Sequence, residues 1–207
     1  MAAAILLLSV IFTGCDDDDK KDNSGLFKNT VWTGEFNYTG TAAQPVSIEF
    51  NESGLVTWHE LAGDATGAWK IENNKLVVTF PGSIGFNADI TGDNKLTHIE
   101  NLPANKWTLV NGQLNEVVEE SLDQTIWTGT NIKLTFKAGD KVDMEVGPTG
   151  DSKYPGTSYI HKGKSVFYSV VAGDYKWFIV RDTKTTFKGV NMFSPDPTVY
   201  QFQLTKN

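Results

Sequence analysis

The stretch Thr30-Val31-Trp32-Thr33-Gly34 recurs further along the chain as Thr125-Ile126-Trp127-Thr128-Gly129. The residues before each copy also correspond in character, with Phe27-Lys28-Asn29 before the first and Leu122-Asp123-Gln124 before the second. A repeat over such a distance fixes the architecture, because each copy starts one structural unit. The repeat therefore predicts two domains that are built in the same way.

Strand-like sequence follows each copy of the repeat. Val46, Ile48 and Phe50, for example, alternate with the polar residues Ser47 and Glu49. Such alternation indicates strands with one buried and one wet face, and the Gly- and Asn-rich segments between them indicate hairpin turns. The predicted strands are 31–38, 46–50, 55–61, 67–71, 75–80, 86–90, 95–100 and 106–110, then 126–129, 132–137, 141–146, 157–161, 165–171, 175–181, 185–192 and 198–204. This pattern predicts an all-β chain of two tandem, small, eight-stranded up-and-down antiparallel barrels, which leave no open sheet edge.

The connections between these strands differ in length. Those after odd-numbered strands are the longer ones, and antiparallel order places all of them at one end of a barrel. We expect each barrel to have a looser mouth at that end and a tight closed end that holds the Trp-x-Gly segment. Strands this short, lined by Phe, Val, Ile and Leu, predict interiors that side chains nearly fill. The long connections are 37–45, 62–66, 81–85 and 101–105 in the first barrel, and 147–156 and 193–197 in the second.

The segments Trp32-Thr33-Gly34 and Trp127-Thr128-Gly129, together with the strand rhythm, resemble the calycin group, which includes lipocalins and avidins. The resemblance covers nearly the whole mature chain and implies two lipocalin-like barrels. Bacteroidota lipoproteins with one or two lipocalin-like domains are a similar case. No ligand motif of the group is present, so the resemblance implies a fold and no particular ligand.

The N-terminal residues predict export and lipid attachment. An apolar run at 2–12 is too short to span a bilayer, and it leads into Phe12-Thr13-Gly14-Cys15, which ends in the chain's single cysteine. The pattern resembles a bacterial lipoprotein signal, which implies that residues 1–14 are removed and that Cys15 is acylated. The alternative is an ordinary secretory signal with a chance cysteine.

An acidic run at 16–19 follows this cysteine directly. It resembles the surface-export signal of Bacteroidota lipoproteins, and its self-repulsion predicts a solvated tether over 15–25. Together the two signals predict a protein that is lipid-anchored in the outer membrane and exposed at the cell surface. With Lys20 the run also matches an engineered protease tag, which is the alternative interpretation.

The segment between the two units has a weak helical pattern. Asn115 is suited to cap a short helix that would place Val118 and Leu122 on one face. A polar linker with two apolar contacts is the equal alternative. The domain boundaries that we expect are 26–112 for the first barrel, 113–121 for a short, partly helical linker and 122–207 for the second barrel.

The composition offers little chemistry. The chain of 207 residues has a net charge of −7 and no basic cluster, which argues against nucleic acid as a partner. His59, His98 and His161 are scattered without metal-ligand spacing, and we expect each to be a solvated or a rim histidine. No nucleophile elbow, phosphate-binding loop or zinc-protease motif occurs. We therefore predict no catalytic, metal or cofactor residues and a protein that is not an enzyme.

Aromatic residues in the predicted mouth loops are the candidate ligand contacts. Tyr38 belongs to the first barrel, and Tyr154 and Phe193 belong to the second. Exposed aromatic rings stack on sugars or bury against a protein, so a glycan or an outer-membrane protein is the expected partner. The alternative is that the rings fold back over the barrel ends. The predicted function is a non-enzymatic binding or interaction protein, with the second barrel more active, and the alternative is a structural accessory subunit of an outer-membrane complex.

Overall fold

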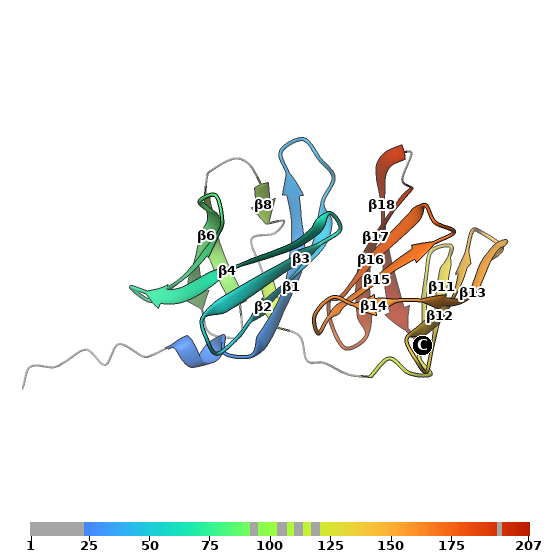
Figure 1. Ribbon diagram of the computed structural model, residues 1–207, viewed down its shortest axis with the longest axis horizontal. Helices are drawn as coiled ribbons and strands as arrows, with labels where there is room; N and C mark the ends of the chain where they lie inside the picture. The colour runs from blue at the N-terminus through green and yellow to red at the C-terminus, as the bar shows by residue number, and fades with distance from the viewer. Residues whose placement is uncertain (1–22, 92–94, 103–106, 110–113, 117–120, 194–195) are drawn as a thin grey trace, which may run out of the picture.

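The computed structural model describes residues 23–91, 95–102, 107–109, 114–116, 121–193 and 196–207. Cys15 and the acidic run 16–19 lie outside the described residues, so lipid attachment stays a prediction. Within the described ranges no helix is long and apolar enough to cross a membrane. The described chain folds into two nearly closed antiparallel barrels, which lie side by side (Figure 1). The predicted fold class is confirmed.

The first barrel follows a short 3-10 helix, η1 (Asn23–Leu26), and contains nine strands in hairpin order. β8 and β9 both pair with β1, at opposite ends of that strand, so together they take one position in the barrel wall. The β1–β2 pairing then closes the barrel. The strands are β1 (Thr30–Tyr38), β2 (Gln44–Phe50), β3 (Leu55–Glu60), β4 (Gly63–Glu72), β5 (Lys75–Phe80), β6 (Ile84–Thr91), β7 (Lys95–Leu102), β8 (Trp107–Leu109) and β9 (Leu114–Glu116).

The second barrel repeats this scheme with one break in its wall. β13 pairs with β12 and β14 pairs with β15, so one predicted strand is split in two at the buried residue Tyr159. The strands are β10 (Ile126–Gly129), β11 (Ile132–Lys137), β12 (Lys141–Val146), β13 (Ser152–Ser158), β14 (Ile160–His161), β15 (Val166–Val171), β16 (Tyr175–Arg181), β17 (Thr186–Phe193) and β18 (Asp196–Lys206).

The two copies of the repeat form the same structure. In the first, the Thr30 hydroxyl donates to the Phe27 carbonyl at 2.8 Å, and the Trp32 indole N–H donates to the Thr30 hydroxyl at 2.9 Å. In the second, Thr125 and Trp127 make the same two bonds, with the Leu122 carbonyl in place of Phe27. Both tryptophans are buried, as expected for side chains that close one end of a barrel.

The predicted strands recur in the structure, but two predicted loops are wrong. β4 begins at Gly63, so 62–66 is mostly strand, and its small and polar residues pair with β3. β13 begins at Ser152, which leaves 147–151 as the loop. Pro155 lies within β13 between the register pairs Val142–Thr157 and Met144–Tyr154, where the ladder is irregular, and a proline is tolerated at such a bulge.

The helix predicted from Asn115 is also wrong where the structure describes it. Residues 114–116 form β9, which pairs with β1 and β7 and completes the wall of the first barrel. Pairing with two neighbours outweighs the weak helical pattern of so short a segment. Val118 lies outside the described residues, and Leu122 is buried in the core of the second barrel.

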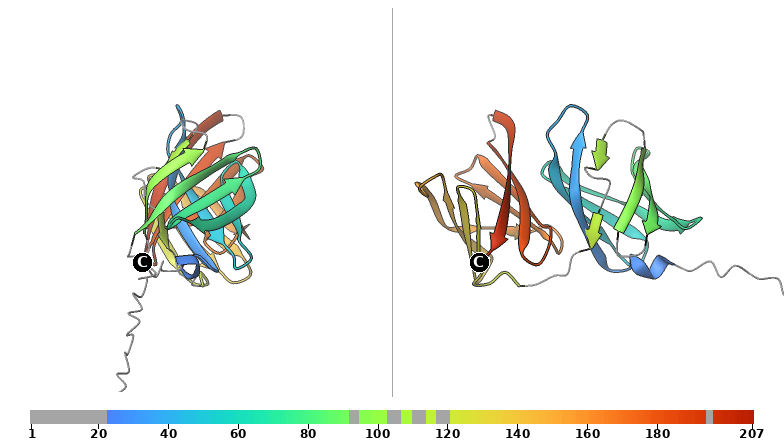
Figure 2. Two further views of the ribbon diagram at one scale, coloured as in Figure 1. Left: turned by 90° about the vertical axis from the view of Figure 1, so that its left-hand side faces the viewer. Right: turned by 180° about the vertical axis from the view of Figure 1, so that it is seen from behind.

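The outer faces of the two barrels pack against each other. β2 of the first barrel approaches β16 and β17 of the second (Figure 2). Leu61 of the first barrel joins a buried apolar cluster with Val166, Phe178, Val180 and Val190 of the second. These four side chains point away from the interior of their own barrel, so the contact between barrels has a core of its own.

Candidate ligand cavity in the first barrel

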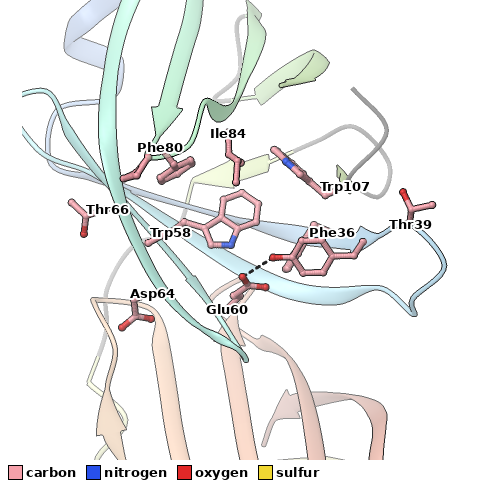
Figure 3. Close-up of a pocket in the computed structure, with 12 residues that line it drawn as sticks. Phe36, Thr39, Trp58, Glu60, Asp64, Thr66, Phe80, Ile84 and Trp107 are labelled. Atoms are coloured by element: carbon pink, nitrogen blue, oxygen red, sulfur yellow. Dashed lines mark hydrogen bonds between the residues drawn. The ribbon is translucent and has the colours of Figure 1, made fainter. Parts of the chain in front are cut away.

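A cavity of about 680 Å³ opens at the mouth of the first barrel, at the end opposite Trp32 (Figure 3). The ends of β1, β3 and β5 and the starts of β4, β6 and β8 supply its walls. A volume of this size is typical of pockets that bind small molecules. The lining residues are Phe36, Tyr38, Thr39, Trp58, Glu60, Asp64, Ala65, Thr66, Phe80, Pro81, Ile84 and Trp107.

Aromatic rings form the floor of this cavity. Trp58 is central, with its ring centroid 5.0 Å from that of Phe36 and 5.2 Å from that of Trp107, both in edge-to-face contact. The Phe80 ring lies 6.2 Å from Trp58 on another side. These rings hold one another in place, so the apolar surface is preformed rather than assembled around a ligand.

A separate cluster of aromatic rings fills the closed end of the first barrel. Phe27, Trp32, Phe50 and Trp69 stack together there, with centroid separations of 5.3 to 5.9 Å. The Trp69 indole N–H donates to the Asn51 carbonyl in the β2–β3 turn, which fixes this cluster at the closed end. The rings at the closed end thus pack against one another, whereas the rings at the mouth line the cavity.

One carboxyl group lies on the cavity wall. The Tyr38 hydroxyl donates to Glu60 Oε1 at 2.8 Å, while Glu60 Oε2 is shielded from solvent and has no hydrogen-bond partner in the described structure. Burial raises the pKa of the Glu60 carboxyl, and the hydrogen bond from Tyr38 offsets only part of that effect. Burial and the adjacent carboxylate also raise the pKa of the Tyr38 hydroxyl, so the hydroxyl keeps its proton. The cavity thus has one polar pair in an apolar wall.

Asp64 marks the rim of the cavity on the side of the second barrel. Its Oδ1 atom lies 3.1 Å from His59 Nδ1 and 3.3 Å from Lys162 Nζ. His59 is only 6% exposed, so the expectation that it would be solvated is wrong. Its side chain leaves the first barrel on the face that the second barrel covers. His98 and His161 are exposed, as expected, and each lies near an aspartate, Asp89 and Asp140 respectively.

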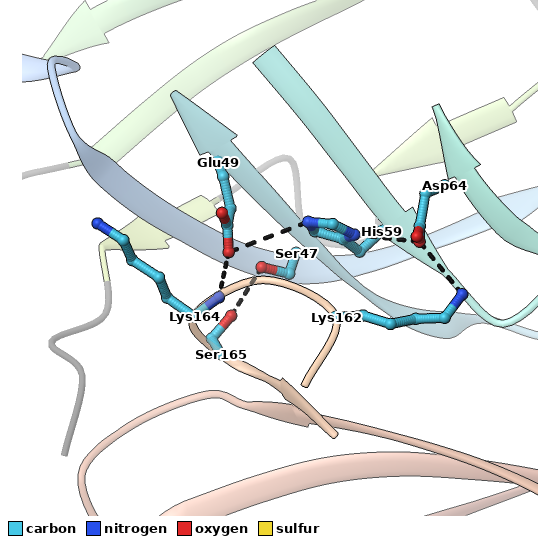
Figure 4. A network of polar contacts seen from close by, with 7 residues as sticks. All are labelled: Ser47, Glu49, His59, Asp64, Lys162, Lys164 and Ser165. Carbon is cyan, nitrogen blue, oxygen red and sulfur yellow. Dashed lines mark hydrogen bonds and ion pairs between the residues drawn. The ribbon is translucent and has the colours of Figure 1, made fainter. Parts of the chain in front are cut away.

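The polar contacts around His59 join the two barrels (Figure 4). The hydroxyl oxygens of Ser47 and Ser165 lie 2.7 Å apart, and the Lys164 backbone N–H donates to Glu49 Oε1. Nearby, Lys188 Nζ of the second barrel lies 2.8 Å from Glu35 Oε2 of the first. Burial alone would lower the pKa of Lys188, but the hydrogen bonds and charges of Glu35 and Asp182 outweigh burial and raise it.

The structure places the three predicted contact residues in different settings. Tyr38 lines the cavity. Phe193 stacks on Tyr175 with centroids 4.7 Å apart, in an open groove of about 530 Å³ at the mouth of the second barrel. Tyr154 packs against the core of the second barrel and is not among the residues that line that groove. The structure therefore does not bring Tyr154 and Phe193 together at one groove.

The interior of the second barrel is filled. An internal space among its core residues measures only about 10 Å³. Trp127 stacks on Phe187 at 3.8 Å, and Phe136 and Phe167 pack beside them. The expectation of nearly filled interiors is thus confirmed for the second barrel and wrong for the first. Two domains of one architecture thus differ in how far side chains fill their interiors.

Of the residues that line the cavity, only Tyr38 was predicted as a site residue from the sequence, and the residues missed include Trp58, Glu60, Phe80 and Trp107. A signal for Glu60 was present, because it follows the inward-facing Val56 and Trp58 at a spacing of two in β3. A carboxylate at an inward-facing strand position, next to buried apolar residues, indicates either the rim of the barrel or a binding site.

Within the described ranges no group of three or more His, Cys, Asp or Glu side chains is arranged to hold a metal ion. Comparison with protein-family models finds no match, and comparison with curated proteins finds none at a significant level. The geometry of the cavity is therefore the basis for a functional conclusion.

Proposed function

We propose that this chain is a non-enzymatic binding protein whose first barrel takes a small, largely apolar molecule. The observation that supports this proposal is the cavity of about 680 Å³ with its aromatic floor. The second barrel has a space of only about 10 Å³ in its interior and a separate open groove of about 530 Å³ at its mouth. Because both barrels have the same repeat and strand order, the fold does not require a cavity with an aromatic floor. The hollow is a property of the first barrel's own side chains.

We also propose that acylated Cys15 tethers the binding domain to the outer membrane, with the acidic run 16–19 as a spacer on the cell surface. Cys15→Ser removes the only residue that can be acylated at the processed end. The variant should leave the membrane fraction, which immunoblotting of washed membranes measures. A variant that stays with the membranes after a high-salt wash would contradict the tether.

Titration with the neutral fluorescent probe N-phenylnaphthylamine tests the binding function. The full chain with Cys15→Ser is used, so that no attached acyl chain competes for the cavity. We expect a saturable rise in probe fluorescence. Ile84, which is 43% exposed and lines the mouth, is the site for a blocking variant, Ile84→Trp. A tenfold loss of affinity, which corresponds to about 1.4 kcal/mol, is the expected effect of the block.

The matched control is Ile160→Trp, because Ile160 is 55% exposed on the second barrel and lies outside the cavity lining. This variant should bind the probe like the parent chain. Absence of saturable binding would contradict the proposal and would favour the structural accessory role instead. Equal affinities in the parent and both variants would place the probe outside the cavity.

A further inference from the structure

The charges at the cavity favour one class of ligand. Glu60 and Asp64 line it, and none of its described lining residues is Lys, Arg or His. Asp64 already lies against His59 and Lys162, whereas the described partner of Glu60 is the neutral Tyr38 hydroxyl. An anionic ligand would meet a carboxylate with no compensating positive charge, and burying such a pair is costly.

The aromatic lining of the cavity also favours a positively charged ligand over an anionic one. The faces of Trp58 and Trp107 carry the negative side of a ring quadrupole, which attracts a cation that comes within about 6 Å of the ring centre. Phe36 and Tyr38, whose ring centroids are 5.3 Å apart, extend this lining to the Glu60 side of the cavity. An apolar ligand with a positive group would therefore find favourable contacts for both of its parts.

The hydrogen bonding of Glu60 is incomplete. Tyr38 has a single O–H donor, which it gives to Oε1, and no donor among the described residues reaches Oε2. A buried carboxylate normally accepts several hydrogen bonds, and an unmet acceptor costs free energy. An ammonium group carries three donors and one positive charge. It can satisfy Oε2 and also donate to the Tyr38 oxygen, which retains lone pairs.

We infer that the preferred ligand of the first barrel is an apolar amine whose protonated nitrogen pairs with Glu60, an inference that rests on the proposed function. Tyr38 is 40% exposed at the mouth, so an entering ligand can displace its hydroxyl from the carboxylate. The apolar part of the ligand then lies against Trp58 and Trp107. Glu60 supplies specificity for the charged group, and the rings supply most of the contact area.

Three probes that share one ring system test this inference. Naphthylethylamine, naphthylethanol and naphthylacetate present an ammonium, a hydroxyl and a carboxylate on the same apolar body. Isothermal titration of the full Cys15→Ser chain at neutral pH measures the three affinities. We expect the amine to bind at least about tenfold more tightly than the alcohol, because a hydrogen bond between charged groups is stronger than one from a neutral hydroxyl. The carboxylate should bind most weakly.

Glu60→Gln keeps the shape of the side chain and removes its charge, so it should abolish the preference for the amine over the alcohol. The control is Glu72→Gln, which removes one exposed carboxylate, paired with Lys70 at the far end of β4, and should keep the preference. Near-ultraviolet circular dichroism of both variants reports whether the aromatic packing is intact.

The outcomes separate this inference from the proposed function. Similar affinities for all three probes in the parent chain would overturn the inference and leave the apolar binding function standing. Failure of all three probes and of N-phenylnaphthylamine to bind would overturn the proposed function itself. An amine preference that survives Glu60→Gln in a folded variant would show that Glu60 is not the partner.

Discussion

Glu60 is a carboxyl group at an inward-facing position of a strand, and this position gives the cavity its polar group. It occupies an inward position in β3, where its neighbours in phase, Val56 and Trp58, are buried. A carboxylate in such a position costs free energy to ionise, unless a partner supplies donors or charge. In the described structure, the Tyr38 hydroxyl is the hydrogen-bond partner of the Glu60 carboxyl group. The residue is therefore better explained by binding than by stability.

The raised pKa of Glu60 predicts a specific pH dependence of stability. The folded chain holds the Glu60 proton to a higher pH than the unfolded chain does, because burial raises its pKa. Between the two pKa values the folded state binds more protons, so the free energy of unfolding falls as the pH rises. Glu60→Gln cannot ionise and should gain stability relative to the parent chain across this window.

Denaturant titrations of the parent and Glu60→Gln chains, from acid to neutral pH, measure this difference. The exposed Glu72→Gln variant controls for the loss of one negative charge. A difference between Glu60→Gln and the parent that stays constant with pH would contradict the assigned burial of the carboxyl.

At the scale of the element, the turn before each Trp-x-Gly segment is the shared building unit. Asn29 has a φ of 60° and Gln124, at the same place in the second copy, has a φ of 62°. Both residues thus adopt the left-handed conformation, which asparagine tolerates better than most residues. The first copy uses a residue suited to this turn, and the second uses one that is strained in it.

Gln124→Gly should therefore stabilise the second barrel, by about 0.5–1 kcal/mol, because glycine has no penalty at positive φ. Thermal unfolding followed by circular dichroism measures the effect. The control is Gln203→Gly in the extended strand β18, which should destabilise the chain because glycine weakens a strand interior. Destabilisation by both substitutions would mean that the Gln124 side chain makes a contact that outweighs its strain.

The strands show which parts of the fold can be predicted from the sequence. Alternation locates strands such as β5 and β11 to the residue, because one face of each is buried and the other is wet. The start of β4 was missed because its glycine, threonine and alanine residues carry no alternation. The cavity could not be predicted, because the apolar lining residues of both barrels look alike in sequence. Only the positions of the rings in space separate a filled barrel from a hollow one.

At the scale of the whole molecule, the β14–β15 turn joins the two barrels. Gly163 in this turn has a φ of 73°, and a Cβ atom there would come within 2.7 Å of His59 Nε2 and would also overlap Glu49. The turn therefore packs so closely on the outer face of the first barrel that a side chain at this position would have to displace Glu49 and His59. The contact also bears on the cavity, because Lys162 in the same turn holds Asp64 at the cavity rim.

Gly163→Ala should loosen the docking of the two barrels. Gly173→Ala is the matched control, because Gly173 has a similar φ of 81° but a Cβ atom added there would meet nothing within 4 Å. Both variants carry the same backbone strain, and only the first adds a clash. Hydrogen exchange at β2 and β16 should therefore rise in Gly163→Ala more than in Gly173→Ala. Equal exchange in the two variants would contradict the assigned contact between the barrels.

A crystal structure of the full Cys15→Ser chain with N-phenylnaphthylamine tests the proposed binding site most directly. We expect density for the probe at the mouth of the first barrel, with its rings in contact with Trp58 and Trp107. The second barrel should hold no probe in its interior. A probe seated instead in the groove beside Tyr175 and Phe193, with the first cavity empty, would contradict the assignment of the binding site to the first barrel.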